Sequence, residues 1–358
     1  MKLKDYLAQL AEGGPGFVQL ALTNACNARC SFCSFSRLSP SQWEQAPWKR
    51  LRPGLAALAA GGIRFLVFTG GEPLLYPQLL PALELSRKLG MTTLLCTNGW
   101  LLNQAKITAL AAAGLSHLII SIDAPTAPAH DAHRGLPGLT AHLRRQIPLI
   151  IAAGLVPVAS VTLSRLVPDL DQLGHFLMEL GFGLVTFSYP LTRLHSSYLS
   201  YAATDLVTFS PQELAARFAD LLAWRRRAPV KVLNPSHSLR EIRRQLQGQP
   251  SQFPCLAGQK YFFVDWQLQV HRCHYLPQIL GPIEEFPQLP RLEDDCQACF
   301  IDCYRDASVQ QWLAISIARA FRLWRQGRWG QAGRELCQTR NLFSLLAALE
   351  GRFWFNHG

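Results

Sequence analysis

The sequence predicts an α/β fold: a partial (β/α)6 TIM-like barrel, then a small cysteine-rich domain and a helical tail. Two observations predict the barrel. Short apolar runs alternate with longer helical patterns through the first two-thirds of the 358 residues, and glycine follows most of the helical patterns, where it caps a helix end. Six such units end near residue 205, whereas a closed eight-unit barrel needs about 250 residues. We therefore expect an open, partial barrel.

The expected elements follow in chain order. The expected strands span residues 17–22, 65–69, 92–97, 117–121, 156–162 and 184–189. The helical patterns between them span residues 48–60, 76–89, 103–113, 140–153 and 169–180. These elements divide the chain into an N-terminal extension (1–16), the barrel (17–205), a basic helical linker (206–254), a cysteine-rich domain (255–306) and a basic aromatic tail (307–358).

The composition excludes several classes of protein. Hydrophobic residues make up 49% of the chain, which is too many for a disordered protein, and ten cysteines are too sparse for a disulfide scaffold. The longest apolar stretch, 147–164, is interrupted by Gly154 and Pro157, so we expect no integral membrane segment. The N-terminus has no secretory signal, which favours a cytoplasmic, reducing location with free thiols. The net charge of +11 is compatible with an anionic ligand or surface.

Three cysteines directly follow the first expected strand. Cys26, Cys30 and Cys33 lie within eight residues, so their thiols can converge on one soft metal centre. A structural zinc site wants four ligands, and residues 34–44 contain neither cysteine nor histidine. Three thiolates on a four-iron cluster would instead leave one iron open for a substrate or cofactor.

This C-x3-C-x2-C motif, with Phe32 before its last cysteine, resembles the signature of the radical SAM superfamily. The resemblance extends over residues 17–205 in the order of elements. A second matching motif, Gly70-Gly71-Glu72-Pro73, directly follows the second strand. In the family this segment binds the methionine amino group of S-adenosylmethionine (SAM). We expect the glycines to let the backbone approach that ligand, and the Glu72 carboxylate to accept from its ammonium group.

Weaker matches lie at the ends of later strands. The resemblance implies SAM contacts by Asn98, Ser121, Asp123 and Arg134, the last within a His-Asp-Ala-His-Arg-Gly segment that resembles a family loop. The resemblance also implies the chemistry. A [4Fe-4S] cluster held by the three cysteines binds SAM, and its one-electron reduction yields a 5′-deoxyadenosyl radical that takes a hydrogen atom from the substrate. Such an enzyme needs an external reductant, such as a flavodoxin-like or ferredoxin-like protein.

A second group of five cysteines lies near the C-terminus. A separated pair plus a C-x2-C is a good four-thiolate set, for which a zinc ribbon remains an alternative. The group resembles the twitch module, a shortened SPASM domain, which implies one auxiliary [4Fe-4S] cluster. The implied ligands are Cys255, Cys273, Cys296 and Cys299, with Cys303 spare or substituting for one of them.

Two further features qualify this second group. Leu268 stands where the full SPASM pattern usually has glycine. His271 and His274 flank Cys273 and are weaker candidate ligands. Both remaining cysteines, Cys96 and Cys337, are expected to be ordinary thiols.

Enzymes of similar layout often modify peptides or proteins, so we expect a ribosomally made peptide as substrate. The change would be cross-linking, dehydrogenation, epimerisation or backbone excision. Because the N-terminal extension is short, we expect a separate leader-peptide recognition protein beside the precursor peptide. A radical SAM enzyme that acts on a small molecule, lipid or tRNA is the first alternative. A non-catalytic zinc or iron–sulfur protein that binds a partner through its tail is the second.

The tail carries many tryptophan and arginine residues, and three interpretations remain open for it. Its helices could pack on the barrel, contact an anionic membrane surface peripherally, or dock a partner.

Overall fold

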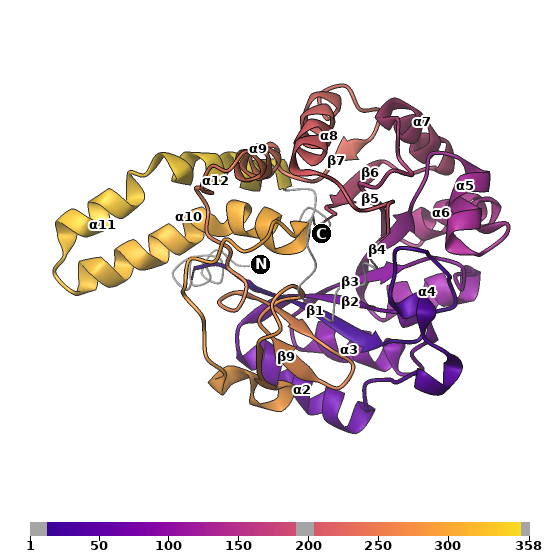
Figure 1. The fold of residues 1–358 in the computed structure, drawn as a ribbon. Coiled ribbons are helices and arrows are strands. Elements are labelled where there is room, and N and C mark those ends of the chain that lie inside the picture. Colours follow the sequence, from indigo (N-terminus) through magenta and orange to yellow (C-terminus); the bar gives the residue numbers. More distant parts are fainter. Residues whose placement is uncertain (1–12, 191–203, 352–358) are drawn as a thin grey trace.

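A computed structural model describes residues 13–190 and 204–351 of the chain. Among these residues the strands form one curved sheet in the order β10-β9-β8-β1-β2-β3-β4-β5-β6-β7 (Figure 1). The strands are β1 (Gly16–Thr23), β2 (Ile63–Gly70), β3 (Thr92–Thr97), β4 (Leu115–Ile122), β5 (Val156–Thr162), β6 (Leu184–Ser188), β7 (Lys231–Val232), β8 (Tyr261–Val264), β9 (Gln269–His271) and β10 (Ile279–Pro282). Strands β1 to β7 run parallel, in chain order. This confirms the α/β class and all six expected strands.

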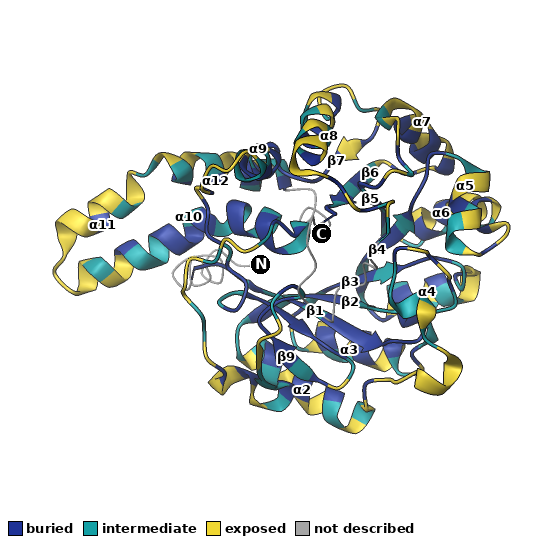
Figure 2. Cartoon of the chain, viewed as in Figure 1, coloured by how far each residue is buried: buried dark blue, intermediate teal, exposed yellow. Residues whose placement is uncertain are grey.

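Most helices connect successive parallel strands and cover the outside of the sheet, and the last four helices follow β7 in the chain (Figure 1). They are α2 (Trp48–Ala60), α3 (Leu79–Lys88), α4 (Gln104–Ala112), α5 (Ala127–Arg134), α6 (Leu139–Ala152), α7 (Leu170–Leu180), α8 (Pro211–Trp224), α9 (Ser236–Leu246), α10 (Asp302–Arg325), α11 (Trp329–Leu336) and α12 (Thr339–Glu350). Apolar side chains on their inner faces pack against the sheet, which gives the buried layer between sheet and helices in Figure 2.

A second, smaller apolar cluster fills the inside of the curved sheet. Alternate residues of a strand point to the same face, and the inward residues of successive strands meet there. The cluster consists of Val67, Leu94, Ile119, Val158 and Leu233. It closes the end of the barrel at which the strands begin, so that a site can form only where they end.

The segment 206–254 does more than link two domains. Helix α8 is the crossover between β6 and β7, and its Trp224 and Phe218 are fully buried. Strand β7 then extends the parallel sheet beside β6. This segment therefore completes the sixth barrel unit and adds a seventh strand. The sequence alone predicts only a basic helical linker here.

The cysteine-rich segment also joins the barrel sheet. Strand β8 pairs parallel with β1, and β9 and β10 follow as an antiparallel hairpin and edge strand. The sheet thus places the second cysteine group beside the strand that leads to the first. The boundary at residue 255 remains a prediction.

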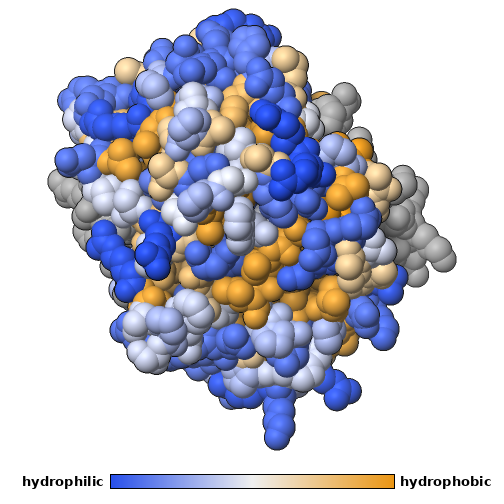
Figure 3. Space-filling view, turned by 90° about the vertical axis from the view of Figure 1, so that its right-hand side faces the viewer, coloured by the Kyte–Doolittle hydropathy of each residue, from blue (hydrophilic) through white to orange (hydrophobic). Residues whose placement is uncertain are grey.

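The surface differs between the two sides of the molecule. The side formed by the barrel helices mixes hydrophobic and hydrophilic residues (Figure 3). Helices α10, α11 and α12 project from the opposite side as a hairpin (Figure 1).

Within the described ranges, no helix combines the length and the apolar character that crossing a bilayer requires.

Candidate active site

The three cysteines of the first group lie in the loop that leaves the carboxyl end of β1. Cys30 is buried, and its carbonyl accepts a hydrogen bond from the Cys33 N–H at 3.2 Å. The Sγ of Cys26 accepts from the Ala28 N–H at 3.4 Å. The Ser36 hydroxyl donates hydrogen bonds to the Cys30 and Cys33 carbonyls, which fixes the end of the loop. These contacts fix the shape of the loop that carries the three cysteines, and the convergence of their thiols on one metal centre stays a prediction.

Burial and mutual repulsion keep these thiols protonated when no metal is bound. Burial raises the pKa of Cys26 to about 11 and that of Cys30 to about 12. The Cys33 charge opposes ionisation of both, which shows that the thiols lie close together. A set of three converging soft donors fits an iron–sulfur cluster, since metal binding replaces the thiol protons.

The glycines of the Gly-Gly-Glu-Pro segment lie against the backbone of the cysteine loop. A Cβ on Gly70, which has φ +122°, would lie 2.2 Å from the Thr23 carbonyl oxygen, and one on Gly71 would lie 2.1 Å from that of Ala25. The Gly71 and Glu72 N–H groups donate to these same two carbonyls at 2.8 and 2.7 Å. The glycines therefore let the turn after β2 dock on the cysteine loop, and their expected close approach to a ligand stays a prediction.

Glu72 is buried and already has three donors from the protein. Its Oε1 accepts from the Leu74 N–H at 3.0 Å and the Thr97 hydroxyl at 2.8 Å, and its Oε2 accepts from the Asn98 N–H at 2.8 Å. Burial raises the pKa of Glu72, and these hydrogen bonds oppose the rise. Pro73 begins the short 3₁₀ turn that follows, Pro73–Leu75. The carboxylate therefore ties the end of β3 to the turn after β2, and its expected role toward an ammonium group stays a prediction.

Asn98 connects these two turns to the cysteine loop. Its side-chain Nδ2 donates to Asn27 Oδ1 at 2.8 Å, and its Oδ1 accepts from the Trp100 N–H at 2.9 Å. Asn98 is itself buried. The expected site residues of strands β1, β2 and β3 are thus joined by hydrogen bonds into one unit.

Asp123 and Arg134 form a buried ion pair beside Cys30. The Arg134 guanidinium lies 2.6 Å from the Asp123 carboxylate, and His133 Nδ1 lies 2.7 Å from it. Burial opposes ionisation of Asp123, but Arg134 and His133 hold the pKa of this carboxyl below its usual range. The Phe32 ring packs 4.5 Å from the His133 ring, measured between centroids.

The segment that carries Arg134 is helix α5, whereas the resemblance suggested a loop. Gly135 ends the helix with a left-handed φ of +62°, and the Arg134 carbonyl accepts from the Arg29 N–H at 2.8 Å. The helix thereby supports the cysteine loop from the side of β4. His133 of this helix was not among the predicted site residues, although it lies in the His-Asp-Ala-His-Arg-Gly segment identified from the sequence.

A row of hydroxyl groups crosses the interior of the sheet near its carboxyl edge. Ser121 on β4 pairs in register with Ser160 on β5, which pairs with Thr186 on β6. These residues lie two positions after the inward Ile119 and Val158, so they share the inner face. The inside of the barrel therefore changes from apolar to hydroxyl-bearing toward the end where the cysteines lie.

The five cysteines of the second group lie together near the start of α10. The Cys255 N–H donates to the Cys296 carbonyl at 2.9 Å. Burial raises the pKa of Cys255 to about 11, and the Cys296 and Cys273 thiols add to the rise. Burial also raises the pKa of Cys303, with added repulsion from Cys299, Cys255 and Cys273 among others. The five thiols are therefore neighbours, and the ligation of one auxiliary cluster by four of them stays a prediction.

Two buried arginines face this thiol group. Arg272, which forms a bidentate pair with Asp294 at 2.6 Å, lowers the pKa of Cys273 against the larger effect of burial. Arg305 likewise lowers the pKa of Cys255. Cations at this position suit a centre whose thiolates carry excess negative charge. Neither residue was singled out from the sequence.

The two histidines near Cys273 have other partners. His271 Nε2 lies 2.8 Å from the Asp265 carboxylate, and the Tyr304 hydroxyl lies 2.7 Å from His274 Nδ1. Burial lowers the pKa of His274 to about 3. Both rings are thus fixed by hydrogen bonds of their own, which disfavours them as metal ligands.

Two aspartates near the start of α10 contact residues that follow β6 and β7, at the carboxyl ends of these strands. The Tyr189 hydroxyl, directly after β6, and the Asn234 amide, after β7, donate to Asp306 at 3.0 and 2.8 Å. The Tyr189 N–H donates to Asp302 at 3.4 Å. Both aspartates are half-buried, and within residues 13–190 and 204–351 neither forms an ion pair with lysine or arginine.

The electrostatics place Asp302 near the inner face of β3. Burial raises the pKa of the inward-facing Cys96 to about 12, and the negative charges of Asp302 and Glu72 add to this rise. Burial raises the pKa of Asp302 itself to about 6. Cys96, expected to be an ordinary thiol, thus lies near both the Glu72 carboxylate and the Asp302 carboxylate of α10.

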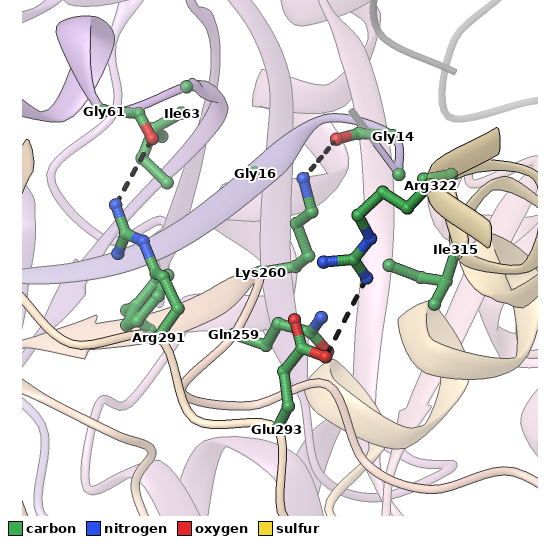
Figure 4. A pocket seen from close by; sticks show the side chains of 14 residues that line it. Gly14, Gly16, Gly61, Ile63, Gln259, Lys260, Arg291, Glu293, Ile315 and Arg322 are labelled. Carbon is green, nitrogen blue, oxygen red and sulfur yellow. Dashed lines mark hydrogen bonds and ion pairs between the residues drawn. The ribbon is translucent and has the colours of Figure 1, made fainter. Parts of the chain in front are cut away.

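A cavity of about 350 Å³ lies at the opposite edge, where β1, β2 and β8 begin. Figure 4 shows its charged lining residues. Lys260 donates to the Gly14 carbonyl at 3.1 Å, Arg291 donates to the Gly61 carbonyl at 3.4 Å, and Arg322 lies 4.0 Å from Glu293. Because these cations have partners and no cysteine lines the cavity, we assign it no part in the site.

Comparison with known proteins identifies the N-terminal part of this arrangement. Residues 20–158, which contain the cysteine loop and the turns that support it, match the family model described as Radical SAM superfamily. The chain contains a radical SAM domain. It is therefore an enzyme of radical chemistry that uses SAM and a [4Fe-4S] cluster.

Two curated relatives cover different shares of this radical SAM enzyme. It is 26% identical over 288 residues to an AdoMet-dependent heme synthase of Methanosarcina barkeri. This match covers 76% of the chain and 80% of that protein. It is 28% identical over 172 residues to a PqqA peptide cyclase of Gluconobacter oxydans. This match covers 47% of each of the two chains.

A solved structure shows the same fold over nearly the whole chain. The structure described as native anSMEcpe with bound AdoMet and Cp18Cys peptide matches with a TM-score of 0.57 and 16% identity. The match covers 95% of this chain and 100% of that one. The fold of this radical SAM enzyme therefore extends through its cysteine-rich segment.

Proposed function

We propose that this radical SAM enzyme modifies a ribosomally made peptide by cross-linking, dehydrogenation, epimerisation or backbone excision. The observation that carries the proposal is the pair Asp302 and Asp306 at the open end of the barrel, above the hydroxyl row of Ser121, Ser160 and Thr186. Carboxylates and hydroxyls accept hydrogen bonds from N–H donors, which a peptide supplies along its backbone and from its basic side chains.

In this proposal Cys26, Cys30 and Cys33 hold the SAM-binding cluster. When bound and reduced, that cluster would supply the electron that cleaves SAM into methionine and a carbon radical, and this radical would take a hydrogen atom from the substrate. The Asn98 side chain, which donates to Asn27, and the Arg134 carbonyl, which accepts from the Arg29 N–H, support the loop from two sides. The apolar cluster at the far end of the barrel keeps bulk water from the site. The electron has to come from outside, so we retain a flavodoxin-like or ferredoxin-like partner.

The second cysteine group would hold one auxiliary [4Fe-4S] cluster, with Cys255, Cys273, Cys296 and Cys299 as ligands. Single alanine variants test this set by their iron content after anaerobic reconstitution. Each ligand variant should lose about four irons, whereas Cys303→Ala and the exposed Cys337→Ala should keep the wild-type content. Loss of a cluster in Cys303→Ala with retention in Cys296→Ala would replace Cys296 by Cys303.

A tetrapyrrole substrate is the second candidate, because the similarity to heme synthase covers three-quarters of the chain. The acidic end of the barrel argues against it. Carboxylate groups of a tetrapyrrole would meet Asp302 and Asp306, and like charges in a half-buried site repel. Other small molecules, lipids and tRNA are less favoured as substrates than a peptide or a tetrapyrrole.

The deciding experiment measures substrate-dependent 5′-deoxyadenosine formation by the reconstituted enzyme. Candidate peptides encoded beside the gene and a heme precursor are offered separately, and products are analysed by mass spectrometry. We expect a mass change in a peptide only. Asp302→Asn should lower this coupled turnover at least tenfold and leave substrate-free SAM cleavage intact. A modified heme precursor with unchanged peptides would contradict the proposal.

A further inference from the structure

The C-terminal hairpin presents an unusual surface. Helices α10 and α12 lie side by side, and α11 forms the far end of the hairpin, away from the barrel (Figure 1). The barrel end of α10 is buried, whereas residues 324–331 at the tip are all exposed (Figure 2). Trp324 and Trp329 stand at this tip with 59% and 69% of their surface exposed.

Helix α12 packs on α10 through its polar and small residues. Ser344 Oγ accepts from the Leu313 N–H at 2.9 Å, and Asn341 donates to the Glu335 and Leu336 carbonyls at 2.8 and 2.9 Å. Ala347 is fully buried on the same face. The helix thus turns its other face outward.

The outward face of α12 is a stripe of leucines. Their spacing of three, four and seven residues is that of one helix face, and each is between 42% and 55% exposed: Leu342, Leu345, Leu346 and Leu349. Such a stripe normally faces a core. Of the thirteen large hydrophobic residues exposed in the described ranges, eight lie between residues 321 and 349. A concentration of this kind marks an interaction surface.

The charge of the hairpin indicates what kind of partner fits. Residues 319–350 contain six arginines and two glutamates, a balance of 6 − 2 = +4. Both glutamates are engaged: Glu350 pairs with Arg225 at 3.0 Å, and Glu335 accepts from Gln338 at 2.8 Å. The arginines at the tip are exposed beside the tryptophans: Arg322, Arg325, Arg328 and Arg334.

We propose that the α11–α12 side of this hairpin docks on an anionic lipid surface. Exposed leucines on one helix face can enter the boundary between headgroups and acyl chains, tryptophan favours that boundary, and arginine pairs with lipid phosphates. A second copy of the chain would bring an equal positive charge against this face. The net charge therefore favours an anionic partner over self-association.

The test is flotation of the reconstituted full-length enzyme with vesicles of phosphatidylcholine, with and without phosphatidylglycerol. The enzyme should bind the anionic vesicles at least tenfold more tightly than the neutral ones, and added salt should weaken the binding. The triple variant Arg325→Gln, Arg328→Gln, Arg334→Gln should lose about 100-fold in affinity for anionic vesicles, since each arginine contributes roughly fivefold.

The leucine stripe is tested by Leu345→Ser with Leu346→Ser. The matched control is Ile151→Ser with Met178→Ser, two exposed apolar residues on α6 and α7. The stripe variant should bind anionic vesicles at least tenfold more weakly, and the control should bind like the wild type. Both should keep SAM cleavage with dithionite, which shows that they fold.

Three results would overturn the proposal. One is equal binding of both vesicle types, or binding of neither. Another is a concentration-dependent dimer that the leucine variant abolishes, because the face would then be an interface between copies. The third is vesicle binding that appears only after residues 352–358 are deleted, because that segment would then be the occupant of the stripe.

Discussion

The Arg134 guanidinium lies 2.6 Å from the buried Asp123 carboxylate, which lies within 4.8 Å of the Cys30 thiol. Against the larger effect of burial, Arg134 lowers the pKa of Cys30, and so favours the thiolate that a metal requires. Its backbone carbonyl also holds the cysteine loop through the Arg29 N–H. One residue thus serves both the shape and the charge of the site.

Removal of this guanidinium should be costly. Arg134→Met leaves a buried carboxylate without its cation, so we expect a loss of about 3–5 kcal/mol in the free energy of unfolding by urea. The control is Arg165→Met, which breaks an exposed pair with Glu213 and should cost less than about 1 kcal/mol. Similar small losses in both variants would show that the buried pair does not stabilise the fold.

Glu72 should act as a fixed acceptor for the turns around it. In Glu72→Gln the side-chain nitrogen cannot accept a hydrogen bond, so one of the buried donors of Leu74, Thr97 or Asn98 loses its partner. We expect a loss of about 1–3 kcal/mol in unfolding free energy, with weaker SAM binding by equilibrium dialysis. Glu84→Gln, on the exposed side of α3, is the control and should change neither quantity. A Glu72→Gln variant with the unfolding free energy and the SAM affinity of the wild type would refute this role.

Leu268 has a left-handed φ of +64° and a fully buried side chain. This conformation explains why related cysteine modules favour glycine there. Leu268→Ala loses the burial and keeps the strain, whereas Leu268→Gly loses both. Both variants should be less stable than the wild type by about 2–5 kcal/mol. The glycine variant should nevertheless be about 1 kcal/mol more stable than the alanine variant in urea. The reverse order would show that the backbone is not strained.

Asp306 should make stability depend on pH. Burial and the neighbouring Asp302 raise the pKa of Asp306 to about 7, above the value of about 3.9 for an unfolded aspartate. The folded protein therefore binds this proton more tightly, and stability falls as pH rises from about 4 through 7. Between pH 5 and 8 the urea midpoint of wild type should fall more than that of Asp306→Asn. Asp205→Asn, an exposed control, should follow the wild type; equal slopes in all three would contradict the expected shift.

The strands and the cysteine loop were predictable because their signals are local. Apolar runs and terminal glycines mark β1 to β6, and the spacing of Cys26, Cys30 and Cys33 identifies the metal site. The aspartates of α10 were not predictable, because Asp306 lies 117 residues from Tyr189 and 72 from Asn234 in the chain. Only the fold brings these groups together.

Two other features escaped the sequence for different reasons. Helix α5 has His130 as its only buried residue, so it lacks the apolar stripe that marks a helix. The leucines of α12 do form such a stripe, but spacing alone does not tell whether a core or a partner covers it. The glycines of the Gly70-Gly71 pair were recognised, but the partner of their close approach, the backbone at Thr23 and Ala25, became evident only from the fold.

The most direct test of the account is the assay of 5′-deoxyadenosine with SAM and dithionite after anaerobic reconstitution, comparing wild type with Cys30→Ala and Cys337→Ala. The account predicts a coloured, iron-loaded wild type and Cys337→Ala variant that both form 5′-deoxyadenosine, and a Cys30→Ala variant that forms none. Continued product formation by Cys30→Ala, or a colourless zinc-loaded wild type that does not cleave SAM, would contradict it.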